Sequence, residues 1–297
     1  MLVNLILTML LLNPLSGSVV QTAAVFDLAE EGAYAPVRIN LENIGVEVTA
    51  ERYAVIDVAS GELLANQKAA SPQAMASITK LMTALVILDL EPDWQMEVEM
   101  SEVDETFGAF PHIYRGEKVK FIDLWKSALV SSDNNSIMSM IRALGILEND
   151  FVVLMNEKAV ELQMNNSKFA DPTGLNENNI STALDVARLL HNALDENEIR
   201  ESVLQGKYVF EILNSKKTRV IYNTDILIDS FLNRKSYGYE LVGGKTGFLY
   251  ESGYCLATQI KKDNHEIIIV VLNSDTIENR FQDVKVLADW IFSNYQW

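Results

Sequence analysis

Strand-like segments occur near both ends of this 297-residue chain, and this placement limits the folds that the chain can adopt. Arg52–Asp57 is a short apolar run, followed by a turn and the run Leu63–Leu64, a pattern typical of a β-hairpin. Near the other end, Tyr254–Ile260 and Glu266–Leu272 are strand-like, and the polar stretch 261–264 joins them as a second hairpin. We therefore predict one sheet built from both ends of the chain.

The middle of the chain is rich in predicted helices, because apolar residues recur there at helical spacing. The predicted helices cover residues 78–90, 121–130, 137–147, 151–162 and 181–194, with Ser181 or Thr182 as an N-cap, and residues 281–292 form a closing helix. The chain therefore has the pattern of an α/β (α+β) fold, in which an antiparallel sheet is flanked by helices and interrupted by an α-helical insertion.

The first 24 residues differ in composition from the rest. Leu2–Leu12 is almost continuously apolar but shorter than the roughly 20 residues of a membrane span, and Pro14 and small residues follow it. We predict a signal peptide at 1–24, although this segment contains no Lys or Arg. The alternatives are an uncleaved anchor, which would associate the protein with a membrane, and a buried N-terminal helix.

The remaining chain is expected to form a lead-in and one main domain. Residues 25–50 are weakly patterned and are expected to form the lead-in at the surface. In the main domain, 51–297, we predict a sheet lobe from about 51–70 and 240–297 and a helical lobe from about 71–239.

Charge and composition exclude several classes of function. The formal net charge of −17 would repel phosphate backbones, so nucleic acid is not an expected partner. Cys255 is the only cysteine, and His112, His191 and His265 are far apart in the sequence. The sequence therefore predicts neither an internal disulfide nor a zinc site, and we expect no metal or cofactor.

Ser77-Ile78-Thr79-Lys80, an S-x-x-K pattern, lies at the start of the predicted helix 78–90. Residues three apart share a helix face, so Lys80 can lie beside Ser77. A serine needs a base to become a nucleophile, and a lysine whose pKa is lowered by burial or nearby cations can serve. Taken alone, this tetrapeptide is better explained as a helix N-cap and a solvated lysine, because serine is a common N-cap.

Two further tripeptides have the same ambiguity when each is taken alone. Ser132-Asp133-Asn134 lies between predicted helices and offers a hydroxyl for proton relay and a carboxamide for a substrate amide. Lys245-Thr246-Gly247 precedes the C-terminal hairpin, and its lysine would place a cation near the relay serine. The glycine would let a substrate backbone approach the strand closely. The alternatives are an interhelical turn and a Gly-rich turn.

The order S-x-x-K, S-x-N, K-T-G is the signature of serine β-lactamases and penicillin-binding proteins. On these motifs the chain resembles the D-alanyl-D-alanine carboxypeptidase and endopeptidase family, the low-molecular-mass penicillin-binding proteins. Further stretches that carry the resemblance are 76–89, 169–175, 182–189 and 244–253. The chain looks most similar to the short endopeptidase-type members, which end soon after K-T-G. The resemblance implies a β-lactamase/DD-peptidase-like fold.

The resemblance implies a role for each motif residue. Ser77 would be the acylated nucleophile, Lys80 its base and Ser132 the proton relay, while Asn134 would hold the substrate amide. Lys245 and Thr246 of the motif Lys245-Thr246-Gly247 would bind the substrate carboxylate. Arg280, beside the closing helix, would also bind it, since a planar guanidinium suits a carboxylate. The backbone N–H of Ser77 and that of Phe248 or Leu249 would form the oxyanion hole.

Two positions depart from the pattern of the family. Leu249 stands where many relatives have Thr, which would remove a contact to the carboxylate. Asp133 is acidic and would raise the pKa of Lys80 if its side chain pointed inward.

The implied activity is hydrolysis of a D-alanyl amide in peptidoglycan stem peptides through an acyl-enzyme, with β-lactams as covalent inhibitors. The protein would be exported and act in the periplasm or on the cell-wall side of the membrane. The residues leave carboxypeptidase and endopeptidase both open. One rival is a serine β-lactamase, although Glu157, Glu161 and Glu177 lack the E-x-x-L-N context of its deacylating carboxylate. The other is a non-catalytic cell-wall sensor.

Overall fold

A five-stranded antiparallel sheet forms from both ends of the chain in the computed structural model, which describes residues 34–106 and 111–297. The strands are β2 (Arg52–Asp57), β3 (Leu63–Gln67), β10 (Tyr239–Leu249), β11 (Gly253–Lys262) and β12 (His265–Ser274). Their order is β10-β11-β12-β2-β3, and β12 pairs with β2 so that Val271 lies opposite Tyr53. The predicted sheet from both chain ends is confirmed.

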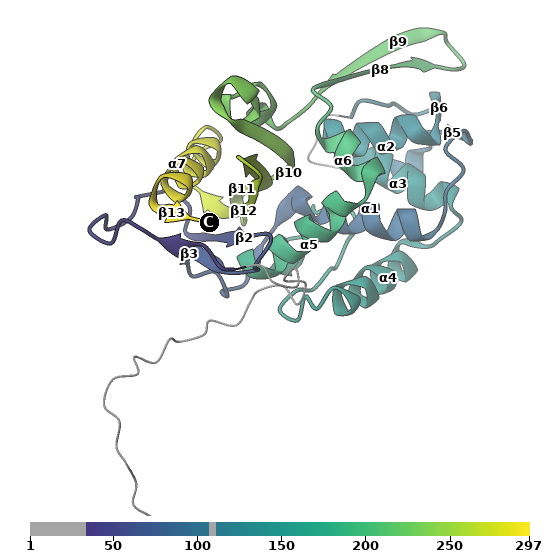
Figure 1. Cartoon of the computed structure of the whole chain (residues 1–297). Coiled ribbons are helices and arrows are strands. Elements are labelled where there is room, and N and C mark those ends of the chain that lie inside the picture. Colours follow the sequence, from purple (N-terminus) through teal and green to yellow (C-terminus); the bar gives the residue numbers. More distant parts are fainter. Residues whose placement is uncertain (1–33, 107–110) are drawn as a thin grey trace, which may run out of the picture.

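Helices cover both faces of the sheet. Helix α7 (Asn279–Asn294) packs on one face, and α5 (Ala183–Asp195) packs on the other with α1 (Thr79–Asp89) beyond it (Figure 1). Residues 267–272 of β12 are all fully buried; the odd-numbered ones face the α7 side and Ile268, Val270 and Leu272 face the helical core. A strand that is buried on both faces explains the continuous run of β-branched residues.

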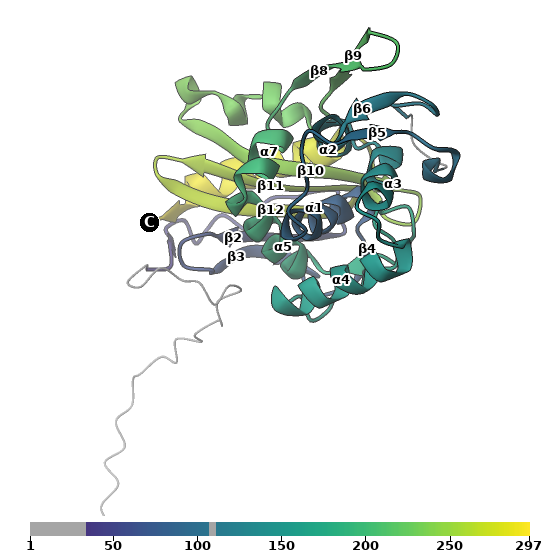
Figure 2. The same ribbon diagram turned by 90° about the vertical axis from the view of Figure 1, so that its right-hand side faces the viewer.

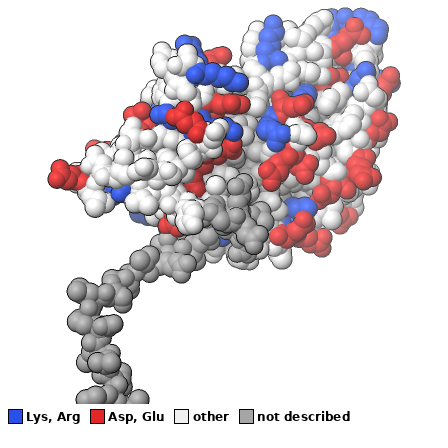
Figure 3. All heavy atoms as spheres, viewed as in Figure 1, with Lys and Arg blue, Asp and Glu red and all other residues white. Residues whose placement is uncertain are grey.

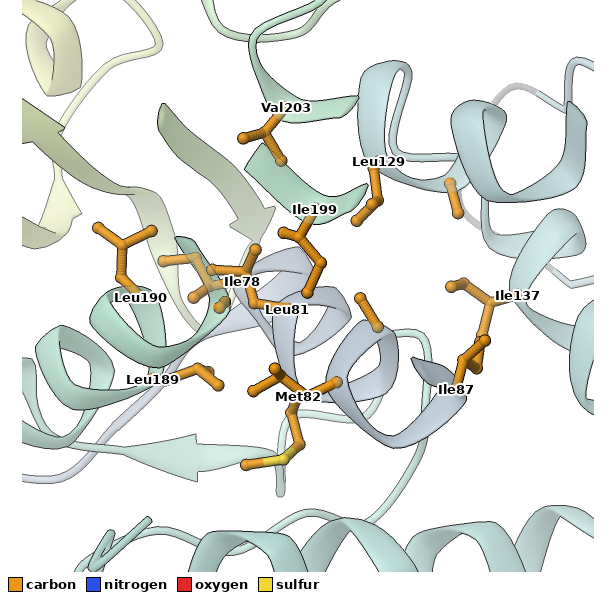
Figure 4. Packing of buried hydrophobic residues seen from close by; sticks show 14 of the residues in the cluster. Ile78, Leu81, Met82, Ile87, Leu129, Ile137, Leu189, Leu190, Ile199 and Val203 are labelled. Carbon is orange, nitrogen blue, oxygen red and sulfur yellow. The ribbon is translucent and has the colours of Figure 1, made fainter. Parts of the chain in front are cut away.

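Helix α1 is the centre of the helical part, and its residues Thr79–Ile87 are all buried. Leu81 and Met82 pack near Leu189 and Leu190 of α5, as Figure 4 shows. Figure 2, seen from the helical side, shows how the other helices surround α1. They are α2 (Phe121–Val130), α3 (Asn134–Ala143), α4 (Glu148–Glu161) and α6 (Asn197–Val203).

Two element ends differ from the sequence prediction, and at a third the structure selects one of the two predicted N-caps. Helix α3 begins at Asn134, three residues before the predicted start, because the Asp133 carboxylate caps it by accepting the backbone N–H of Ser136. Thr182 rather than Ser181 caps α5. The turn between β11 and β12 is shorter than predicted, since only Asp263 and Asn264 leave the strands, both with positive φ.

Short two-stranded pairs complete the fold. The most prominent is the hairpin of β8 (Lys207–Ile212) and β9 (Lys217–Tyr222), which projects above α2 and α6 (Figures 1 and 2). No strand was predicted there. The others are β1 (Val37–Arg38) with β13 (Tyr295–Gln296), β4 (Gln73–Ala74) with β7 (Ile180–Ser181), and β5 (Glu97–Glu99) with β6 (Lys118–Lys120).

The predicted signal peptide at 1–24 lies outside the described residues, as does the first part of the lead-in. From residue 34 onward, the lead-in crosses α7, where Thr49 and Ala50 donate backbone N–H groups to the Asp283 carboxylate. Among the helices that the structure describes, none has the length and apolarity needed to cross a bilayer.

Candidate active site

Ser77 lies in a tight 3₁₀ turn that leads directly into α1. Ala76, the residue before it, has a φ of 49°, a strained value for a residue with a side chain and one that recurs at active sites. Two glycines pack closely against the backbone of this turn. A Cβ on Gly174 would lie 2.2 Å from the carbonyl oxygen of Ala76, and a Cβ on Gly247 would lie 2.8 Å from that of Met75. The backbone of Ser77 is therefore held from both sides.

Lys80 is fully buried, and its ammonium head lies directly beside the candidate nucleophile. Lys80 Nζ lies 3.1 Å from Ser77 Oγ, 2.5 Å from Asn134 Oδ1 and 2.6 Å from the carbonyl oxygen of Thr173. Burial lowers the pKa of Lys80 to about 7, and the carboxylates of Asp171 and then Asp133 oppose that shift. A large fraction of Lys80 is therefore neutral near pH 7 and able to accept a proton.

The S-D-N segment connects α2 to α3 and brings a second hydroxyl to the site. Ser132 has a φ of 64°, and its Oγ accepts a hydrogen bond of 3.0 Å from Lys245 Nζ. The Asp133 carboxylate is occupied as the helix cap and by the backbone N–H of His112 at 2.7 Å. Asp133 thus raises the pKa of Lys80 without a hydrogen bond to it.

Lys245 is the buried cation behind Ser132. Besides Ser132, its ammonium donates to the carbonyl oxygen of Thr246 at 3.1 Å. Burial, with Lys80 and Arg280 nearby, lowers the pKa of Lys245 well below its usual range, and Asp225 opposes the shift. The site therefore contains two lysine–serine pairs, Lys80 with Ser77 and Lys245 with Ser132.

The other two K-T-G residues serve the site differently. Thr246 Oγ1 lies 2.7 Å from Thr224 Oγ1, which fixes the threonine side chain at the pocket wall. Gly247 was expected to admit a substrate backbone. The structure adds a reason for glycine there, because a side chain would collide with the turn that carries Ser77.

Arg280 is buried at the start of α7 and lines the same pocket as Ser77. Its NH1 group donates to the carbonyl oxygen of Gly247 at 3.2 Å, and its guanidinium lies over the rings of Phe281 and Tyr254. Arg280 is therefore a buried cation at the pocket and not an exposed residue of the first helical turn.

The role of the loop 171–179 was not predicted from the sequence, although residues 169–175 are among the stretches that carry the resemblance. The Asp171 carboxylate accepts backbone N–H groups from Thr173 and Gly174, and Asn179 Nδ2 joins Asp171 to Thr79 Oγ1 of α1. This network holds the Thr173 carbonyl against Lys80. The Asp-Pro-Thr-Gly sequence was the available signal, because an Asp side chain often bonds the backbone of the turn that follows it.

The pocket above these residues has a volume of about 490 Å³. It brings together six of the predicted residues, Ser77, Ser132, Asn134, Thr246, Gly247 and Arg280, while Lys80 and Lys245 are buried behind it. Its other lining residues are His112, Ser131, Gly174, Leu175, Tyr222, Thr224, Phe248, Leu249 and Ile277.

Carboxylates are absent from this pocket lining among the described residues. Glu157 and Glu161, considered above as lactamase-type bases, line a separate hollow between α1 and α4. An anionic ligand therefore meets Arg280 without facing an acidic side chain. In the part of the chain that the structure describes, no group of three or more His, Cys, Asp or Glu side chains is placed to hold a metal ion.

The rate of acylation by a β-lactam should depend on pH through Lys80. Only neutral Lys80 can take the Ser77 proton, so the rate should fall about tenfold per pH unit below a pKa of about 7 and level off above it. Time courses of fluorescent-penicillin labelling between pH 5.5 and 9 measure this. Asp133→Asn, which removes an opposing carboxylate, should move the acid limb to lower pH. A flat profile would contradict the role of Lys80.

The fold, the Lys80–Ser77 contact and the Lys245–Ser132 contact define a serine hydrolase of the penicillin-recognising class. The sequence pattern that defines the family D-alanyl-D-alanine carboxypeptidase matches residues 39–276, and the chain belongs to that family of serine peptidases. It is 32% identical to a D-alanyl-D-alanine endopeptidase of Pseudomonas aeruginosa over 80% of this chain and 75% of that protein.

Solved structures agree with this assignment. A penicillin-binding protein homologue from Mycobacterium tuberculosis superposes with a TM-score of 0.77 at 21% identity, over 86% of this chain and 96% of that one, which supports the fold. Penicillin-binding protein D2 of Listeria monocytogenes, solved with bound cefotaxime, gives a TM-score of 0.71 at 25% identity, over 82% of this chain and 98% of that one.

Proposed function

We propose that this serine D-alanyl-D-alanine peptidase acts as an endopeptidase on peptidoglycan cross-links, with Ser77 as its nucleophile. The observation that carries the proposal is the pair of contacts Lys80–Ser77 at 3.1 Å and Lys245–Ser132 at 3.0 Å. One pair supplies a base for the attacking hydroxyl, and the other supplies an acid for the leaving amine.

Acylation follows from these two contacts. Lys80 takes the proton of Ser77 as Oγ forms a bond to the D-alanyl carbonyl carbon. As the C–N bond breaks, Ser132 gives its proton to the leaving nitrogen, and the ammonium of Lys245 replaces that proton. Water then attacks the ester carbonyl carbon, and its proton passes through Ser132 to restore the ammonium of Lys245. As the ester C–O bond breaks, Lys80 returns its proton to Ser77 Oγ and the shortened peptide is released. The acyl-enzyme is the intermediate that a β-lactam would trap.

The developing oxyanion requires two backbone N–H groups beside Ser77. The N–H of Ser77 itself is one. Of the two strand candidates, Leu249 already donates its N–H to Ser252 Oγ at 2.8 Å, so we assign the second group to Phe248. Asn134 would hold the substrate amide, and Thr246 with Arg280 would bind the carboxylate that adjoins the scissile bond. Leu249 offers no hydroxyl for that carboxylate, so Arg280 carries more of its binding.

Two features support an endopeptidase over a carboxypeptidase. The pocket continues past Ser132 and Thr246 to Thr224 and the largely exposed Tyr222, so a leaving group larger than one amino acid has room. The similar protein of Pseudomonas aeruginosa is an endopeptidase by name.

Mass spectrometry of defined muropeptides tests the proposal. The protein should split a cross-linked dimer into two monomers, with slower loss of a terminal alanine from a pentapeptide monomer. Loss of alanine alone would make it a carboxypeptidase. A chromogenic β-lactam separates the rivals, because rapid repeated hydrolysis indicates a β-lactamase and no covalent adduct indicates a non-catalytic sensor.

The substrate also implies the location. Peptidoglycan lies outside the cytoplasmic membrane, so the protein would act in the periplasm or at the cell wall, with residues 1–24 as its export signal or anchor.

A further inference from the structure

The hairpin β8–β9 has one buried face and one free face. Phe210, Ile212 and Ile221 are almost fully buried, whereas the alternate residues point to solvent. On the free face, three cross-strand pairs lie in a row, Tyr222 with Lys207, Val220 with Val209, and Thr218 with Glu211. Val209 is 48% exposed and Val220 is 40% exposed, although valine is a residue that strands usually pack. We call these six residues the hairpin face.

The hairpin face begins at the active-site pocket. Tyr222 lines that pocket and is also the last residue of β9. Two residues further along the chain, Thr224 Oγ1 forms a hydrogen bond of 2.7 Å with Thr246 Oγ1. The adjacent Lys245 donates a hydrogen bond from Nζ to Ser132 Oγ. Ser132 is the proposed proton donor to the leaving nitrogen. The hairpin therefore lies at the end of the pocket where the leaving group would be bound.

The hairpin contains more cationic than acidic side chains, unlike the chain as a whole. Residues 207–222 contain four cationic side chains, Lys207, Lys216, Lys217 and Arg219, and one acidic side chain, Glu211, in a chain whose net charge is −17. Lys216 forms an ion pair with Glu211 and Arg219 forms one with Glu117, so Lys207 is the cation that the hairpin face itself offers to a ligand. In Figure 3, blue atoms lie beside red ones at the upper right, where Figure 1 draws this hairpin. Lys207 is exposed and makes no ion pair with any residue that the structure describes. A partner with carboxylates and some apolar surface fits such a face.

We propose that the hairpin face binds the leaving peptide strand of a cross-link, an extended, carboxylate-bearing peptide. The inference rests on the proposed endopeptidase function, because a single leaving amino acid would not reach past Tyr222. The aliphatic parts of the strand lie on Val209 and Val220, and Lys207 pairs with a carboxylate of that strand. Such a surface raises the affinity for cross-linked peptides without contributing to the bond-breaking step.

Two sets of variants test the hairpin face. Val209→Thr with Val220→Thr keeps β-branched side chains and hence strand propensity, and Lys207→Glu reverses one charge. The matched controls lie away from the pocket lining. Val153→Thr with Val160→Thr alters two exposed valines of α4, and Lys168→Glu reverses an exposed lysine.

The combined hairpin variant should lower kcat/KM for a cross-linked muropeptide dimer by about 5- to 20-fold. Its rate of penicillin acylation and its release of alanine from a pentapeptide monomer should stay within twofold of the wild type. In a Ser77→Ala background, Kd for the uncleaved dimer should rise by a similar factor. The controls should change none of these quantities.

Three results would overturn the inference. They are unchanged dimer cleavage, an equal loss on dimer, monomer and penicillin, and an equal effect of the control variants. Failure of the proposed function has a different signature, because the wild-type protein would then leave the dimer intact or form no penicillin adduct at all.

Discussion

Replacement of Ser77 by alanine should abolish covalent capture of penicillin and lower peptide hydrolysis by about 10⁴-fold or more. The reason is that Ser77 Oγ is the only hydroxyl with Lys80 Nζ as a hydrogen-bond partner among the described residues. Intact-protein mass spectrometry after incubation with penicillin measures the adduct. The wild type should gain one penicillin mass, and the variant should gain none.

Ser132→Ala is the informative companion to this variant. It removes the hydroxyl that Lys245 contacts but leaves Lys80 and Ser77 in contact, so an adduct should still form, at a lower rate. An adduct on the Ser77→Ala protein at any other residue would show that the nucleophile lies elsewhere. Thermal unfolding of both variants should stay close to that of the wild type, since neither change leaves a large cavity.

Lys80→Met should slow acylation by about 10²- to 10⁴-fold, because methionine fills similar space but cannot take a proton. The variant should also lose the acid limb of the pH profile, because the titrating group near pH 7 is gone. Stopped-flow or time-resolved penicillin labelling measures both effects.

Stability must be followed in the same variant. Asn134 Oδ1 and the Thr173 carbonyl lose their donor, which costs about 1–3 kcal/mol each, while removal of a desolvated ammonium acts in the opposite direction. A folded variant with slow acylation supports the role of Lys80 as base. Acylation within tenfold of the wild-type rate in a folded variant would assign the base to another group.

The sequence was sufficient to predict elements whose apolar period is regular. The strands around 52–57 and 266–272 and the helix 121–130 agree with the structure because one buried pattern dominates each of them. It was not sufficient for the bounds of β10, because three glycines and the buried Lys245 interrupt its apolar pattern, although K-T-G was assigned to a strand of the sheet lobe. These residues are explained by neighbours distant in the sequence, since Gly247 meets the turn at Ser77 and Lys245 meets Ser132.

The candidate site shows the same division. The three motifs could be read from the residues, and their side chains lie within hydrogen-bonding distance of one another in pairs. The hydrogen bond from Lys80 to the carbonyl oxygen of Thr173 could not be predicted from the sequence, because a backbone oxygen has no sequence pattern of its own. The hairpin β8–β9 was also missed, since its free face carries apolar and charged residues without the alternation typical of an exposed strand.

The turn that carries Ser77 is clamped between Gly174 and Gly247, and Ser77 and Lys245 are separated by more than half of the chain. A nascent chain still emerging from the ribosome therefore lacks one side of the clamp until β10 has been synthesised. Ser77 should therefore become reactive only after β10 has been synthesised and has packed against this turn, which would protect the growing polypeptide from early acylation. The time course of penicillin labelling can accordingly report this late folding step, because only molecules in which β10 has packed against the turn at Ser77 should become labelled.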